Sequence, residues 1–127
     1  MNDSEDDAGR NRRETPSSVV QGRAARQLVA PVQEKLGLWQ AEAIKLETMV
    51  QRVRGAGRSD PSIAEAARTL LNVINMQAQL FEANVSAADP VVRGHSRVTD
   101  AQKVLGLLVT RVETILADLG EQSDKAR

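Results

Sequence analysis

The sequence predicts an all-α protein, a three-helix up-down-up bundle or a long helical hairpin, with a disordered N-terminal tail and a tendency to self-associate. Two segments repeat apolar residues at alternating steps of three and four, the spacing of helices that pack along one face. Between them lie residues 69–88, in which Glu82 is the only charge. Turn signals separate the three segments, and the connections are too short for crossovers.

Composition favours one soluble domain with charged flanks. The chain has 127 residues, of which 41% are hydrophobic, and its 17 basic side chains balance 17 acidic ones. Because cysteine is absent, disulfides, thiolate nucleophiles and zinc–thiolate sites are excluded. No signal peptide or membrane-spanning apolar run is recognisable, so we expect a cytoplasmic protein without membrane contact. The prevalence of arginine over lysine favours a bacterial source.

The chain divides into four parts by composition. Apolar residues are almost missing at the start, so nothing offsets the entropy of ordering it. Gly22 and Pro31 weaken or kink any helix that begins at Thr15-Pro16. The predicted parts are a disordered acidic and basic tail (1–15), a weak or kinked helical arm (16–30), a helical bundle domain (31–120) and a second disordered tail (121–127).

The first long helix carries the clearest heptad pattern, typical of a coiled coil. Its seam runs over more than three heptads: Val29, Val32, Leu36, Trp39, Ala43, Leu46, Val50 and Val53. Charged residues occupy the opposite face, so the helix is amphipathic. The helix is expected to end at Gly55-Ala56-Gly57, where glycine permits a turn.

The second helix is predicted over residues 61–87. Asp60 supplies its N-cap, Pro61 fits the first turn, and Asp89-Pro90 marks its end. Polar residues form one narrow stripe, which leaves an apolar arc of roughly 220° at 100° per residue. This arc is wider than one intramolecular interface requires.

The third helix is expected to follow a loop over residues 91–98. Thr99 and Gln102 have the spacing of a capping box, and Gly120 is the expected end. The seam of this helix consists of Ala101, Leu105, Leu108, Val112, Ile115 and Leu119. In the antiparallel register Phe81 falls near Gly106. Either this glycine permits close packing, or it is a tolerated weak point that costs about 1 kcal/mol.

Surplus apolar residues of the second helix predict a partner interface. Its expected members are Val73, Met76, Gln77, Leu80 and Asn84. Gln77 and Asn84 are amides inside the apolar arc, and two interpretations stay open for them. They fix the register or the oligomeric state, or they are satisfied locally or exposed at a rim.

Basic residues predict a second, electrostatic surface. The bundle brings several of them to one pole, beside the basic part of the tail. The members are Arg10, Arg12, Arg13, Arg23, Arg26, Arg93 and Arg97. A basic pole binds nucleic acid or an acidic protein, but no aromatic residue is available here to stack on bases. A solvated pole without a ligand is the remaining alternative.

No pattern in the chain indicates catalysis, a metal or a cofactor. His95 is the only histidine, and its neighbour Ser96 lacks a separate oriented base. No Glu-x-x-His spacing occurs. We therefore expect a non-enzymatic interaction module, an adaptor, chaperone or assembly subunit, that forms a homo-oligomer, a dimer above all, and binds a protein partner. The alternative is a regulator that binds nucleic acid through Arg23, Arg26, Arg93 and Arg97.

Overall fold

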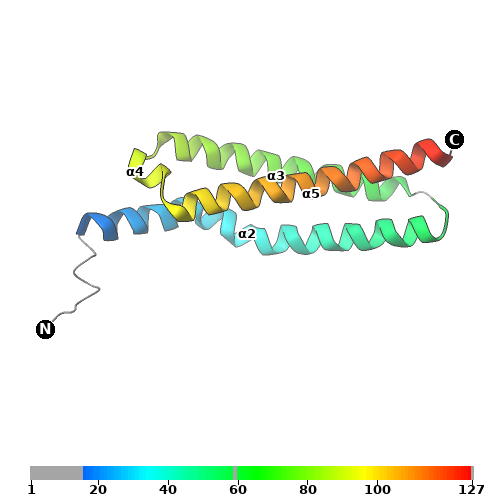
Figure 1. The fold of residues 1–127 in the computed structure, drawn as a ribbon, viewed down its shortest axis with the longest axis horizontal. Coiled ribbons are helices and arrows are strands. Elements are labelled where there is room, and N and C mark those ends of the chain that lie inside the picture. The colour runs from blue at the N-terminus through cyan, green and yellow to red at the C-terminus, as the bar shows by residue number, and fades with distance from the viewer. Residues whose placement is uncertain (1–15, 59, 127) are drawn as a thin grey trace, which may run out of the picture.

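The computed structural model describes residues 16–58 and 60–126, so the tail predicted over 1–15 lies outside the described residues. In these ranges the chain is helical and contains no strand. Figure 1 shows the order of the helices along the chain. They are α2 (Pro16–Gly55), α3 (Pro61–Ala87), α4 (Pro90–Arg93) and α5 (Ser96–Ala126). The all-α class is confirmed, but α4 adds a short helix to the three that were expected.

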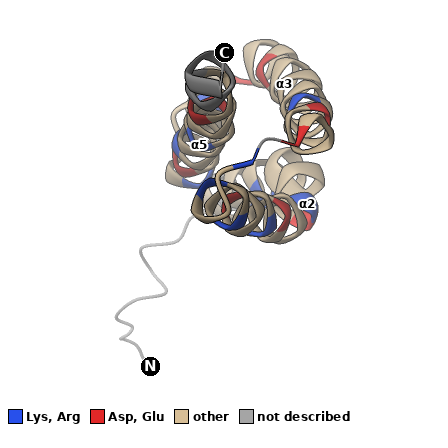
Figure 2. Ribbon diagram, turned by 90° about the vertical axis from the view of Figure 1, so that its right-hand side faces the viewer, with Lys and Arg blue, Asp and Glu red and all other residues tan. Residues whose placement is uncertain are grey.

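The three long helices form a bundle in which α3 runs opposite to α2 and α5 (Figure 1). Each of the three packs against the other two, and the view along the axis in Figure 2 shows them at the corners of a triangle. Helix α4 covers one pole, where it contacts α2, α3 and α5. The short connections between consecutive helices account for this up-down-up order.

Both predicted heptad seams face the bundle axis. Every member of the α5 seam is buried, and so is every member of the α2 seam except the half-buried Leu36. Helix α3 contributes Ile63, Ala67, Ile74, Phe81 and Val85. The core is therefore one continuous apolar column, and the two seams are confirmed.

Helix α2 is continuous over 40 residues and includes Pro31. Proline has no N–H for the helical ladder, and its ring crowds the preceding turn. The ribbon of α2 changes direction where its colour passes from blue to cyan, which is the region of Pro31 (Figure 1). Ala25 and Val29 precede the bend and are fully buried. The first part of α2 therefore packs against the bundle.

Local signals end α2 and begin α3 as predicted. Gly57 has a φ of 68°, and the N–H groups of Gly57 and Arg58 bond the carbonyls of Arg54 and Val53. This pattern is a Schellman motif, in which glycine occupies the left-handed position at no steric cost. Asp60 caps α3 by accepting hydrogen bonds from the N–H and the hydroxyl of Ser62, at 3.0 and 2.6 Å.

Helix α5 differs from its predicted bounds at both ends. It begins at Ser96 within the predicted loop, and it continues through Gly120 to Ala126. The expected capping box is wrong, because Thr99 lies inside the first turn and donates to the Ser96 carbonyl. Gln102 instead donates to both carboxylate oxygens of Glu82 on α3, at 3.0 and 3.1 Å. A sequence pattern does not reveal that a neighbouring helix offers Gln102 a better partner.

His95 caps α5 in place of Thr99. Its carbonyl accepts from the N–H groups of Val98 and Thr99, and its imidazole Nδ1 accepts from the N–H of Arg97 at 3.2 Å. The side chain therefore satisfies one donor of the first turn. Within the described ranges, no helix has the length and apolar character needed to cross a membrane.

Candidate interaction surface

Helix α3 carries a second apolar seam on its outer surface. Six residues recur at alternating steps of three and four, all are exposed, and none is charged. We call them the α3 seam: Ala66, Thr69, Val73, Met76, Leu80 and Ala83. Its three large members are 41%, 65% and 57% exposed, in chain order. Large apolar side chains with this spacing on one helix face are typical of helix–helix contacts.

The α3 seam exists because α3 has more apolar surface than its two neighbours cover. One stripe, which includes Ile74 and Phe81, is buried between α2 and α5. The α3 seam lies beside it and faces solvent. The sequence predicted the three large members but missed Ala66, Thr69 and Ala83. Their regular spacing was the available signal.

The two predicted interface amides lie along one edge of the α3 seam. Gln77 is half-buried and Asn84 is exposed. Neither side chain hydrogen-bonds to any residue of the described part. Both amides flank the α3 seam, at positions equivalent to those that border the seam in a coiled coil. A local hydrogen-bond partner for these two amides is therefore not seen in the described chain, and the register role and exposure at a rim stay open.

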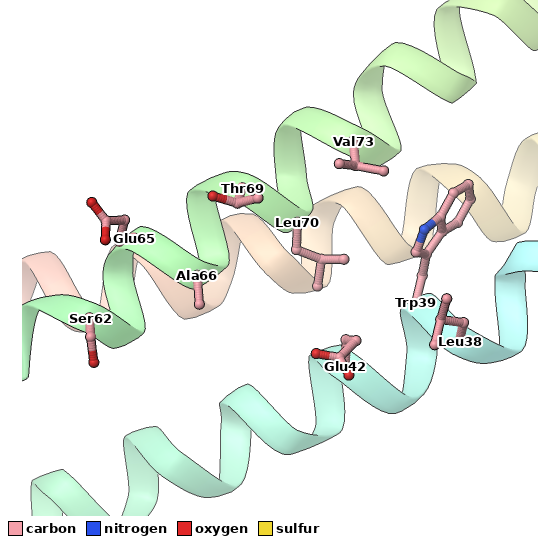
Figure 3. Close-up of a pocket in the computed structure, with 9 residues that line it drawn as sticks. All are labelled: Leu38, Trp39, Glu42, Ser62, Glu65, Ala66, Thr69, Leu70 and Val73. Carbon is pink, nitrogen blue, oxygen red and sulfur yellow. The ribbon is translucent and has the colours of Figure 1, made fainter.

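A groove of about 530 Å³ runs between α2 and the first half of α3. Figure 3 shows the side chains that line it. They are Leu38, Trp39, Glu42, Ser62, Glu65, Ala66, Thr69, Leu70 and Val73. The groove shares Ala66, Thr69 and Val73 with the α3 seam. The two features therefore form one connected surface with different chemistry at its two ends.

The groove combines an apolar floor with two carboxylates. Leu70 and the indole of Trp39 form the floor, and Trp39 is only 3% exposed. Glu42 comes from α2 beside Leu70, and Glu65 comes from α3 nearer to Ser62 (Figure 3). Neither glutamate forms an ion pair with a described residue, and no lysine or arginine lines the groove. The local charge of the groove is therefore negative.

The predicted basic surface is only partly within the described chain, because Arg10, Arg12 and Arg13 lie outside it. The remaining four members are exposed, on α2 (Arg23, Arg26), α4 (Arg93) and α5 (Arg97). The guanidinium Nη1 of Arg93 donates to the Ser86 carbonyl at 3.2 Å, which engages part of its donor capacity. Acidic and basic residues both occur on each long helix (Figure 2).

Stacking on nucleic-acid bases requires exposed aromatic rings, and this chain offers none. Its aromatic residues are Trp39 and Phe81, which are 3% and 2% exposed. Stacking platforms for single strands are therefore missing from the arginine-bearing pole. Among the predicted site residues, the large exposed apolar side chains are those of α3.

The described residues bring no three His, Asp or Glu side chains together in an arrangement that holds a metal ion. The Nδ1 atom of His95 is engaged in capping α5. Comparison with known proteins adds no further guide: no family model, no curated protein and no solved structure matches the chain.

Proposed function

We propose that this protein is a non-enzymatic helical interaction module, an adaptor, chaperone or assembly subunit, that associates with a second copy of itself through the α3 seam. The observation that carries the proposal is the run of six exposed, uncharged residues at heptad spacing from Ala66 to Ala83. Exposed apolar residues that occur singly need no explanation, but a continuous heptad seam does.

The order of large and small residues suits an antiparallel pair of α3 helices. About a two-fold axis between Val73 and Met76, each Val73 faces the partner's Met76. The same axis sets Thr69 against the partner's Leu80, and Ala66 against the partner's Ala83. Large residues then fill the centre of the contact, and small residues let the two helices approach at its ends.

The margins of this contact are almost free of charge. Gln77 and Asn84 flank the α3 seam on one side, and Asn72 and Gln79 flank it on the other. Because no ion pair is formed or broken, association is expected to depend little on salt. An arginine-mediated complex with nucleic acid would weaken steeply as salt rises.

Light scattering after size-exclusion chromatography tests the proposal. We expect the wild-type chain to shift from monomer to dimer with increasing concentration, and the Leu80→Glu variant to remain a monomer. Leu107→Glu is the matched control, because Leu107 is an equally large leucine, 66% exposed, on α5 away from the α3 seam. Wild-type chain that stays monomeric at the highest attainable concentration, or equal dissociation by both variants, overturns the proposal.

A further inference from the structure

We infer that the groove between α2 and α3 binds a basic amphipathic helix of a second protein. The occupant is defined by three features of the groove: its apolar floor, its two carboxylates and an indole N–H that has no partner among the described residues. This inference does not rest on self-association, since the groove is formed within one chain.

The floor of the groove requires an aliphatic anchor. Trp39, Leu70 and Val73 meet at one end of the groove, and Leu38, which is 59% exposed, adds to the same end. A leucine or isoleucine of an incoming helix covers these side chains and loses its own contact with water. Without an occupant, Leu38 and Val73 at this end stay in contact with solvent.

The opposite end of the groove requires a cation. Glu65 lies eight residues before Val73 on α3, a distance of about 12 Å at 1.5 Å per residue. Glu42 lies one turn after Leu38 on α2 and is level with Leu70, whereas Glu65 lies further along the groove beside Ser62 (Figure 3). A lysine or arginine about one turn from the aliphatic anchor therefore meets Glu42, and a second one about two turns from the anchor meets Glu65.

The indole of Trp39 provides an observation independent of charge. Trp39 is only 3% exposed, yet its indole N–H donates to no acceptor among the described residues. Buried indole N–H groups usually have a partner, because an unmade hydrogen bond costs free energy. In Figure 3 the nitrogen edge of the ring is turned toward Leu70, inside the groove. Because Trp39 lines the groove, we expect a side-chain or backbone oxygen of the occupant to serve as the acceptor.

A second copy of this chain does not satisfy these requirements through its α3 seam. The seam carries no cation to meet Glu42 and Glu65. Because Ala66, Thr69 and Val73 belong to both surfaces, a basic helix in the groove and a second α3 on the seam exclude each other. The partner helix is therefore expected to release the monomer from the dimer.

Titration with synthetic peptides tests the inference, and Trp39 reports binding because it is the only tryptophan. The probe is a tryptophan-free helical peptide with leucines at steps of three and four and lysines beside them. A second peptide carries glutamate in place of each lysine. We expect the lysine peptide to change the Trp39 emission and to bind roughly three- to thirty-fold tighter than the glutamate peptide at low salt.

Two sets of variants locate the effect. Glu42→Gln with Glu65→Gln should remove the preference for the lysine peptide, whereas the control Glu113→Gln with Asp100→Asn on α5 should keep it. Leu80→Glu should bind the lysine peptide as a monomer, because Leu80 does not line the groove. Peptide binding by the Leu80→Glu variant separates the two proposals, because this variant is expected to bind the peptide without forming a dimer.

Equal affinity for both peptides overturns the inference, and so does an unchanged preference in the Glu42→Gln, Glu65→Gln variant. A Trp39 emission that stays constant at saturating lysine peptide has the same meaning, because an occupant of the groove must contact the indole.

Discussion

Glu47 of α2 and Arg111 of α5 form a two-pronged ion pair across the bundle. The guanidinium Nε and Nη2 donate to the two carboxylate oxygens at 2.6 and 2.7 Å. The residues are 64 positions apart in the chain, and Arg54 and Asp118, at 3.7 Å, are separated by the same number (111 − 47 = 118 − 54 = 64). The second pair lies one heptad further along both helices, with the charges exchanged.

This exchange fixes the register of the parallel helices α2 and α5. A slip of α5 by one heptad in one direction brings Glu47 to Asp118. A slip in the other direction brings Arg54 to Arg111. Both slips place like charges together, whereas the apolar seams alone tolerate a shift of seven residues. The ion pairs therefore contribute more to specificity than to stability, as expected for pairs this exposed.

The Glu47–Arg111 pair predicts a pH dependence. The hydrogen bond from Arg111 lowers the pKa of Glu47, and the positive charge of Arg111 acts in the same direction against the effect of burial. A lowered folded-state pKa stabilises the fold above the unfolded-state pKa, and the stabilisation is lost as pH falls through the folded value. We expect Glu47→Gln to lower the thermal midpoint slightly at neutral pH, and this loss to shrink as the pH is lowered toward about 3 and the carboxylate takes up a proton. Thermal scans at the two pH values measure this. Glu113→Gln, which removes no ion pair among the described residues, should show no such pH dependence.

Two glycines predict opposite responses to alanine. Gly106 lies inside α5, is exposed, and has nothing within 4 Å of an added Cβ. Gly106→Ala should therefore stabilise the fold by about 0.5–1 kcal/mol, the helix-propensity difference. The close-packing interpretation of Gly106 against Phe81 is wrong. Gly57 has a φ of 68°, so Gly57→Ala should instead lower the free energy of unfolding by about 1–2 kcal/mol. Urea unfolding measures both, and a stabilised Gly57→Ala would contradict the Schellman assignment.

Because the imidazole of His95 caps α5, asparagine should replace it with less loss of stability than alanine. His95→Ala removes the acceptor for the Arg97 N–H and should cost about 1 kcal/mol, as for other side-chain caps. His95→Asn retains an acceptor at the cap and should recover most of that loss. Chemical unfolding of the two variants tests the capping role. If alanine and asparagine are equally destabilising, His95 acts by packing instead.

Substitution of a buried and of an exposed residue of α3 should change the free energy of unfolding by very different amounts. Ile74 is fully buried, so Ile74→Ala should cost about 2–5 kcal/mol. Met76 is 65% exposed, and Met76→Ala should change monomer stability by no more than about 0.5 kcal/mol. Both substitutions should be measured in the Leu80→Glu variant, because dimer formation would otherwise add to the unfolding free energy. Comparable losses would mean that Met76 is part of the core.

Local signals in the sequence determined the three long helices and most of the core. Proline and aspartate bound α3, glycine ends α2, and heptad spacing selects the buried faces of α2 and α5. These features depend on residues within one or two turns, so they are readable without a fold. The burial of Trp39, Leu105 and Ile115 followed from the same periodicity.

Only the tertiary structure decided what lies between helices. Gln102 pairs with Glu82 and not with its own helix start, because α3 brings a carboxylate into reach. Helix α2 continues past Pro31, because burial of Ala25 and Val29 offsets the lost hydrogen bond. The wide apolar arc of α3 was visible in the sequence. How its area divides between the core, the groove and the α3 seam depends on where α2 and α5 lie, since two neighbours cover only part of a helix surface.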